Sequence, residues 1–497
     1  NVVIGATASD ASTTASFNAY VGYGAGGATT TGGGNVGIGY LAAEDLTTGA
    51  SNTFIGNQAG ANTTTSGDNV AVGALALNTN TTGANNTAVG RGALRYSTTA
   101  SNNSAFGYKA LNVNTTGTSN VAVGHEAGKD ITTGSQNVFV GKEAGHKTTT
   151  GTFNTALGHQ AYGTGGGSAT TGQFNTAIGY AALYSTTSAS NNSALGKYAL
   201  LYCTTGTQNN AFGSGSLQNC TTGNYNCAFG QASLNSLTTG DNNTAVGDNA
   251  MQFGTTMDVC VAIGQNAGRN ATASNNVWVG AGAGNANTSG DKNTMVGREA
   301  GVAVTTGANN VLLGGSAGYD LTVGGQNVIV GVNNQSGAGG RAYATILGYG
   351  LVGGSNDATL LGRGSNDSQL LHGATTWTAP SDVRLKEEIQ DEQIGLDFIN
   401  ELRPVTFRWK KAKDIPTNMN AHKEGSEERV MNGKYNHGFI AQEVKEVIDK
   451  YDFKDGFDLW SEDDTDGRQR VGEASLIPML VKAIQELSKE IKQLKGE

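Results

Sequence analysis

The chain has 497 residues and a formal net charge of −9, and 75 of its residues are glycine but only 14% are charged. Glycine is about twice as frequent as usual and charge is well below the usual quarter, which argues against an ordinary globular composition. No basic patch indicates nucleic-acid binding, and no apolar run reaches the roughly 18 residues of a membrane span. From the first residues of this sequence we expect no signal peptide.

The first 331 residues repeat a unit of about 17 residues, of which Asn86–Gly90 (Asn-Thr-Ala-Val-Gly) is typical. We number positions in each unit from its last glycine, so that −1 is the residue before that glycine. This repeat glycine falls at 5, 22, 39, 56, 73, 90, 107, 124, 141, 158, 179, 196, 213, 230, 247, 264, 280, 297, 314 and 331. Position −1 is apolar in all 20 units, and position −4 is asparagine in all but one, where Cys260 replaces it. Such a fixed period indicates a stacked array.

The composition of the unit predicts strands rather than helices. Glycine, paired threonines and asparagine disfavour helix, and short runs between them are typical of strands and tight turns. We expect one coil per unit, with a short strand, a corner at the repeat glycine, a second short strand and a Thr-Thr-Gly turn. Coils stacked about 4.8 Å apart would form a β-solenoid about 100 Å long. Position −1 is predicted to be a buried apolar stripe and position −4 a ladder of amides.

These units resemble the β-roll repeats of trimeric bacterial adhesin heads, and they look like the repeat shafts of phage tail fibres. In both cases the resemblance implies three chains winding side by side. Because residue 1 is already a repeat asparagine, we expect an upstream part that anchors the chain, for example to a tail or baseplate protein.

Side-chain chemistry in the array predicts no cofactor and no metal. Cys203 and Cys220 lie 17 residues apart, within disulfide reach on adjacent coils, but we favour two free thiols. Cys227 and Cys260 occupy scaffold positions, and neither zinc spacing nor an Asp-rich calcium repeat is present. Charged residues are scattered, with none recurring at one position, so we expect no convergent acidic pair.

The array departs from its period at two places, and some of its surface residues could contact a partner. Four extra residues near Gly163–Ser168 are expected to bulge at the surface. Tyrosines such as Tyr180 and Tyr198 follow some repeat glycines and could bind sugar, although scattered exposed tyrosines are usually plain surface. Residues 332–380 keep only an echo of the repeat. They are either the distal tip of the shaft, where a receptor could bind, or a transition that closes the solenoid.

A second domain is predicted over residues 381–497. It holds 44 of the 71 charged residues, and all four prolines lie at or after Pro380. Helices are predicted over 391–402 and 441–450, strands over 405–409 and 435–440, and an acidic loop over 451–474. A last helix over 475–495 carries apolar residues in heptad spacing, which predicts a short coiled coil. These are Ile477, Leu480, Ile484, Leu487, Ile491 and Leu494.

Four motifs occur in this domain in the order of a known family. They are Ser381–Ile389, Leu396–Lys410, His437–Val444 and Leu476–Leu487. They closely resemble the intramolecular chaperone domain of phage tail spikes and fibres, the endosialidase-type, self-cleaving (peptidase S74-like) family. The resemblance implies a small α+β domain that trimerises the chain, templates the β-structured shaft and then cuts itself off.

The resemblance places the cut at the Pro380–Ser381 bond, with Ser381 as nucleophile and Lys386 as general base. A serine hydroxyl needs a base, and lysine can serve only if desolvation or a nearby cation lowers its pKa. Five residues correspond to about 140° around a helix, so we expect Ser381 in a loop and Lys386 on the element that follows. Without the resemblance, Ser-Asp would indicate a helix N-cap. His437 is not included in the predicted site.

The favoured function is a homotrimeric phage tail fibre or spike in the virion tail that binds a host cell-surface receptor, for example a glycan. The only enzymatic activity expected is autoproteolysis. One alternative is a trimeric bacterial surface adhesin, with a secretion signal and an anchor upstream. The others are a polysaccharide-degrading tail spike and an ice-binding solenoid.

Overall fold

The computed structural model describes residues 1–163, 165, 167–353, 355–451, 453, 458–463 and 466–496. The chain divides into two compact units, Asn1–Pro380 and Ser381–Glu497. None of the helices in the described ranges has the length and apolar character needed to cross a membrane.

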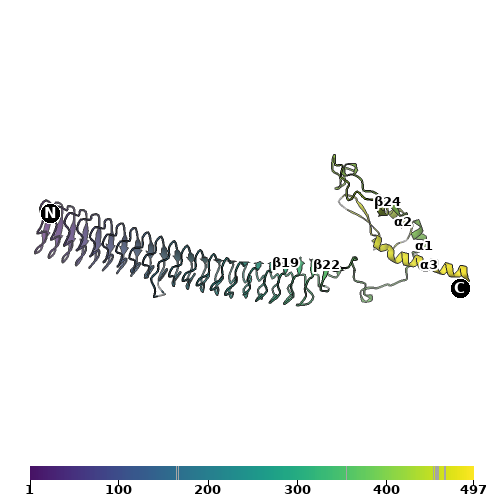
Figure 1. Ribbon diagram of the computed structural model, residues 1–497, viewed down its shortest axis with the longest axis horizontal. Helices are drawn as coiled ribbons and strands as arrows, with labels where there is room; N and C mark the ends of the chain where they lie inside the picture. Colours follow the sequence, from purple (N-terminus) through teal and green to yellow (C-terminus); the bar gives the residue numbers. More distant parts are fainter. Residues whose placement is uncertain are drawn as a thin grey trace. The chain divides into compact units, whose positions relative to one another are not determined.

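The N-terminal unit is a β-solenoid in which each repeat forms one rung (Figure 1). Positions −3 to −1 form a three-residue strand, and the repeat glycine follows it. Neighbouring strands pair in parallel and in register, as Ala88 does with Ala105, which confirms the predicted solenoid. The strands are β1 (Val2–Ile4), β2 (Ala19–Val21), β3 (Val36–Ile38), β4 (Thr53–Ile55), β5 (Val70–Val72), β6 (Thr87–Val89), β7 (Ser104–Phe106), β8 (Val121–Val123), β9 (Val138–Val140), β10 (Thr155–Leu157), β11 (Thr176–Ile178), β12 (Ser193–Leu195), β13 (Asn210–Phe212), β14 (Cys227–Phe229), β15 (Thr244–Val246), β16 (Val261–Ile263), β17 (Val277–Val279), β18 (Thr294–Val296), β19 (Val311–Leu313) and β20 (Val328–Val330).

Each rung has one strand, so the prediction of a second strand after the glycine is wrong. Positions +2 and +4 adopt left-handed backbone, for example at Leu75 (φ 59°) and Leu77 (φ 51°). A strand needs strongly negative φ, so this segment turns instead. It still bonds to the next rung, because both the N–H and the hydroxyl of Thr81 donate to the carbonyl of Thr98, at 2.9 and 3.0 Å.

Position −2, rather than position −1, fills the interior of the rungs. Successive strand side chains point to opposite faces, and Ala88 and Phe139 at position −2 are fully buried. At position −1, Phe106 is 42% exposed and Leu157 is 47% exposed. The predicted buried stripe at position −1 is therefore wrong, and that apolar row lies on the outside of the array.

Core volume is balanced between positions −2 and +4. In most rungs with alanine at position −2, as at Ala88, position +4 is a large side chain, here Leu94. In most rungs where position −2 is large, as at Phe139, position +4 is glycine, here Gly145. A β-carbon on Gly145 would lie 2.6 Å from the ring of Phe139. In these rungs the two positions together fill a similar space, as close packing requires.

We expect Gly145→Ala to destabilise the array more than Gly215→Ala. Both glycines have left-handed φ, 64° and 67°, so both variants carry the same kind of backbone strain. At Gly215 the nearest atoms to a new β-carbon are the movable ends of Gln218 and Asn235, at 3.2 and 3.3 Å. The clash with Phe139 should cost Gly145→Ala about 1–3 kcal/mol more. Equal midpoints in thermal unfolding would contradict this packing account.

The asparagines at position −4 form the predicted ladder, which the hydrogen bonds confirm. The N–H of Asn86 donates to Oδ1 of Asn69 at 3.0 Å, and Nδ2 of Asn86 donates to the same oxygen at 3.2 Å. Nδ2 also donates to the carbonyl of Ala100 at 2.8 Å. Because Asn86 is fully buried, these bonds satisfy polar groups that burial would otherwise leave unpaired.

Replacing Cys260 with asparagine should stabilise the array. The N–H of Cys260 donates to Oδ1 of Asn243 at 3.1 Å, but towards the backbone of Asn276 Cys260 presents only a thiol sulfur, a weak acceptor. Cys260→Asn is expected to supply a stronger acceptor and to raise the free energy of unfolding by about 1 kcal/mol. Cys227→Asn, at position −3 on the outer face, should stay within about 0.5 kcal/mol of wild type. A thermal midpoint no higher than that of the control would refute the effect.

Beyond β20 the sheet gains two parallel strands and ends in a hairpin. β21 (Thr345–Tyr349) pairs with β20, and β22 (Ala358–Arg363) pairs with β21. β23 (Asn366–Leu371) then folds back antiparallel onto β22. The hairpin occupies the edge on which another parallel rung would otherwise pair.

The C-terminal unit combines helices with two antiparallel strand pairs around a buried core of Phe398, Leu402, Val444, Val447, Leu459, Leu476 and Met479. Its elements are η1 (Val383–Leu385), α1 (Leu396–Glu401), β24 (Val405–Phe407), η2 (Ala412–Asp414), β25 (Asn436–Gly438), α2 (Ala441–Ile448), β26 (Trp460–Glu462), β27 (Gln469–Val471), η3 (Glu473–Leu476) and α3 (Ile477–Lys495).

Two predictions for the C-terminal unit need correction. One prediction in each unit also falls partly outside the described residues. The helix predicted over 391–402 is only α1, because Gly395 forms its N-terminal boundary. The predicted loop over 451–474 contains the antiparallel pair β26 and β27. Residues 452, 454–457, 464 and 465 of that loop, and residues 164 and 166 of the predicted bulge, lie outside the described residues.

Candidate functional site

Ser381 and Lys386 lie together at the start of the C-terminal unit. Nζ of Lys386 donates to Oγ of Ser381 at 2.7 Å. Ser381 precedes the single turn η1 and Lys386 is its C-cap, so this turn closes the five-residue separation. Asp382 holds the turn by accepting the N–H of Arg384 at 2.8 Å. The Arg384 side chain, which also donates to this carboxylate, lowers the pKa of Asp382.

Both members of the Ser381–Lys386 pair are exposed in the single chain. In this geometry Lys386 is the hydrogen-bond donor and Ser381 the acceptor. A lysine acts as a base only where burial or a neighbouring cation favours its neutral form. The pair therefore has the proximity that nucleophilic catalysis needs, and its activation requires further protein around Lys386.

Comparison with known proteins finds a family for this part of the chain. Residues 381–453 match the family described as chaperone of endosialidase. The C-terminal unit carries an endosialidase-chaperone domain. The matched residues include Ser381, Lys386, α1 and α2, whereas α3 lies beyond them. A search of curated proteins found no match to the chain.

His437 of the endosialidase-chaperone domain lies on β25, apart from the serine–lysine pair in its contacts. Its Nδ1 is 3.4 Å from Oγ1 of Thr406 on β24, and it lines a hollow of about 310 Å³ with Phe439 and Glu473. Among the described residues it makes no hydrogen bond to Ser381 or Lys386.

The heptad residues of α3 form an exposed apolar seam. Its least exposed members, Leu480 and Leu487, are each 42% exposed, and Leu494 is 88% exposed. The helix face beside the seam carries Met479 and Ala483, which are buried, and Met479 belongs to the core of the endosialidase-chaperone domain. A heptad seam left in solvent is a surface for packing against other helices.

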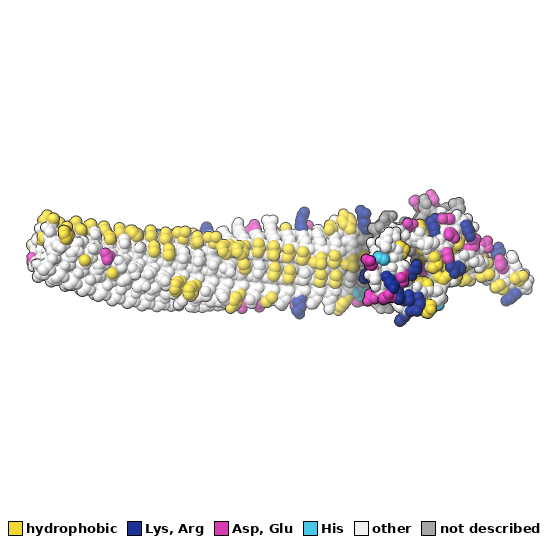
Figure 2. All heavy atoms as spheres, turned by 90° about the horizontal axis from the view of Figure 1, so that it is seen from above, with side chains coloured by type: hydrophobic (Ala, Val, Ile, Leu, Met, Phe, Trp, Pro, Cys, Tyr) yellow, Lys and Arg dark blue, Asp and Glu magenta, His cyan; other side chains and the backbone are white. Residues whose placement is uncertain are grey.

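A second exposed apolar surface runs along the array, and we call positions −1 and −3 of β1–β20 the strand face. Position −1 is apolar in every rung, and position −3 carries Val, Ala, Thr, Ser, Asn or Cys, so the strand face holds no charged residue. Figure 2 shows hydrophobic side chains in rows along the array. Contiguous exposed apolar surface of more than a few hundred Å² marks an interaction site, and a row 20 rungs long exceeds that size.

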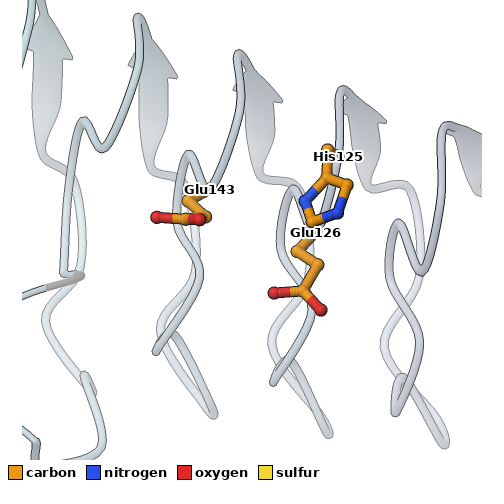
Figure 3. A group of neighbouring side chains, drawn as sticks. All are labelled: His125, Glu126 and Glu143. Carbon is orange, nitrogen blue, oxygen red and sulfur yellow. The ribbon is translucent and has the colours of Figure 1, made fainter.

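Two carboxylates converge in the array, so the prediction of no acidic pair is wrong. Glu126 and Glu143 both occupy position +2, on adjacent rungs (Figure 3). With His125 they place three potential ligand atoms within 4.8 Å of one another. The signal was present in the sequence, because residues 17 apart stack on each other.

The neighbours of these carboxylates neutralise them. Nζ of Lys129 lies 3.4 Å from Glu126, and Nζ of Lys142 lies 3.4 Å from Glu143. Gln160 donates to Glu143 at 2.9 Å and lowers its pKa, whereas a glycosidase acid needs a raised pKa. A divalent cation would have to displace both ammonium groups. The group is thus a surface ion-pair network that fits neither a hydrolytic nor a metal centre.

Cys203 and Cys220 are free thiols, as predicted, and they stack on adjacent rungs inside the array. Burial raises the pKa of both thiols, that of Cys220 to about 12. Thiols that stay protonated at neutral pH are poor nucleophiles, so these cysteines are core residues.

Proposed function

We propose that the chain is the shaft of a phage tail fibre or tail spike, and that it attaches the virion tail to a host receptor. Its endosialidase-chaperone domain assembles three copies, templates the array, and then cleaves itself off between Pro380 and Ser381. The observation that carries this proposal is the strand face, an uncharged and largely apolar surface along the whole array that a lone chain leaves in water.

The array by itself cannot select its alignment with other copies. Every rung offers nearly the same strand face, so a slip of one rung loses contacts only at the ends. Pairing between distant or separate segments is slow, and exposed sheet edges aggregate during the delay. A domain that joins three chains at one end would set one register from which the rungs zip.

The seam of α3 supports assembly from the C-terminal end. Isoleucine and leucine in alternating heptad positions would by themselves favour two strands. The trimer therefore has to be imposed by the remainder of the endosialidase-chaperone domain, and the exposed seam contributes affinity.

Exposure of the serine–lysine pair supports coupling between assembly and cleavage. In a lone chain Lys386 is exposed. A lysine becomes a base where burial favours its neutral form, and assembly that buries Lys386 would let it take the proton of Ser381. Cleavage would then follow correct assembly, and loss of the template would leave the shaft kinetically trapped.

Intact-mass and native-mass measurements on the expressed chain test the proposal. We expect two products that meet at Pro380–Ser381, with residues 1–380 trimeric. A soluble, folded monomer of uncleaved chain would refute it.

A further inference from the structure

We propose that a tyrosine-lined hollow on the side of the array binds a neutral oligosaccharide. The inference deepens the attachment role proposed above, because it gives that role a site and a ligand class. The hollow measures about 400 Å³ and crosses four consecutive rungs. It is lined by Tyr180, Tyr184, Tyr198 and Tyr202, with Gln160 and Gln218 at its two ends along the chain.

The tyrosines are concentrated at this place. Four of the 16 tyrosines of the chain fall within residues 180–202, on two adjacent rungs. The rings of Tyr180 and Tyr198 meet edge to face with centroids 5.3 Å apart. Residues 17 apart lie next to each other on neighbouring rungs. The four tyrosine rings therefore line one surface.

The hollow adjoins the longest rung of the array. The repeat glycines at 158 and 179 are 21 residues apart, where 17 is the rule. The N–H of Gly165, in the extra segment, donates to the carbonyl of Tyr184 at 2.9 Å. A β-carbon on Gly165 would overlap the ring of Tyr184, so the absence of a side chain at residue 165 allows its backbone to lie close to that ring.

The hydroxyls at the hollow differ from those of the buried tyrosines. The hydroxyl of Tyr20 lies 3.0 Å from Oγ1 of Thr29, and that of Tyr162 donates to the carbonyl of Gly172 at 2.8 Å. Within the described part of the chain, the four hydroxyls at the hollow make no hydrogen bond. Two of these side chains, Tyr180 and Tyr202, are 41% and 47% exposed. The rings and hydroxyls of Tyr180 and Tyr202 are therefore available to a ligand, whereas Nζ of Lys197 lies 4.8 Å from the ring centroid of Tyr198.

This surface matches a sugar in chemistry and size. The C–H faces of a pyranose carry slight positive charge and stack on the negative face of an aromatic ring. Sugar hydroxyls both donate and accept, as tyrosine hydroxyls and glutamine amides do. No lining residue is charged, and the nearby ammonium of Lys197 already lies over the ring of Tyr198, so the lining itself favours a neutral ligand. The volume lies in the range of small-ligand sites.

The site is compatible with the proposed assembly. The four tyrosines occupy positions +1 to +6, on the turn that follows the repeat glycine, and none belongs to the strand face. Partner chains that cover the strand face would leave these turns in solvent.

Binding of the full chain to an array of neutral oligosaccharides, with two to six hexose or N-acetylhexosamine units, tests the proposal. We expect wild type to bind a subset of them, and Tyr180→Ala and Tyr202→Ala each to weaken that binding at least tenfold. Tyr225→Ala removes a tyrosine that is 57% exposed elsewhere on the array and should bind like wild type. Tyr202→Phe keeps the ring and should lose less affinity than Tyr202→Ala.

Three results would overturn the proposal. These are no binding of any oligosaccharide by wild type, equal binding by the alanine variants, and binding only of peptides or charged polymers. The mass and oligomeric state of every variant are measured alongside. A failed binding test leaves cleavage and assembly unaffected, and a chain that does not cleave can still be tested for binding.

Discussion

Ser381→Ala is expected to abolish cleavage and to leave one chain of 50.7 kDa where wild type gives two products. The hydroxyl that Lys386 approaches at 2.7 Å is the proposed nucleophile, and no other group replaces it in the variant. Removing a catalytic serine typically slows hydrolysis by at least about a thousandfold. Intact mass followed over time after expression measures the effect.

Two further variants separate catalysis from folding. Lys386→Arg keeps the positive charge, but arginine does not lose its proton in proteins, so cleavage should also stop. Ser461→Ala removes an exposed serine hydroxyl on β26 and should cleave normally. If Ser381→Ala is processed as fast as Ser461→Ala, Ser381 is not the nucleophile. If only Lys386→Arg is processed, Lys386 is not the base.

The rungs could be predicted from the sequence, but the face of the strand that is buried could not. The 17-residue period located the strands of the 20 rungs. Asn86 and its equivalents had to pair because stacked amides donate to one another. Both faces of the strand carry apolar residues, however, and position −1 is the more hydrophobic. Ala88 suits the interior only because Leu94 fills the space beside it, and this pairing becomes visible once the turn is folded.

The contact between Ser381 and Lys386 also depends on a local turn that the sequence motif does not specify. The motif named both residues, and their catalytic roles stay predictions. Regular helix geometry separates residues five apart, whereas the single turn η1, held by Asp382, brings Ser381 and Lys386 into contact. The pair Glu126–Glu143 is different, because its spacing of 17 residues in the sequence is enough to stack the two carboxylates on adjacent rungs.

The array expressed without residues 381–497 is expected to yield less than about a tenth of the soluble trimer obtained from the full chain. Without the endosialidase-chaperone domain, the strand faces of separate chains meet in any of some 20 registers. Most of these leave apolar rungs unpaired at both ends, and such ends recruit further chains. Size-exclusion chromatography with light scattering measures trimer against aggregate.

Substitutions in the seam of α3 test whether the C-terminal unit drives trimer assembly without removing that unit. Ile484→Asp is expected to reduce trimer yield, because it places a charge at a seam position that is 65% exposed in the lone chain and would be buried on assembly. Gln485→Asp adds the same charge beside the seam and should assemble like wild type. A loss shared by both variants would point to general damage to the helix. If the isolated array formed trimers of the same size and thermal midpoint as the processed shaft, the strand face would carry its own register and the template would be unnecessary.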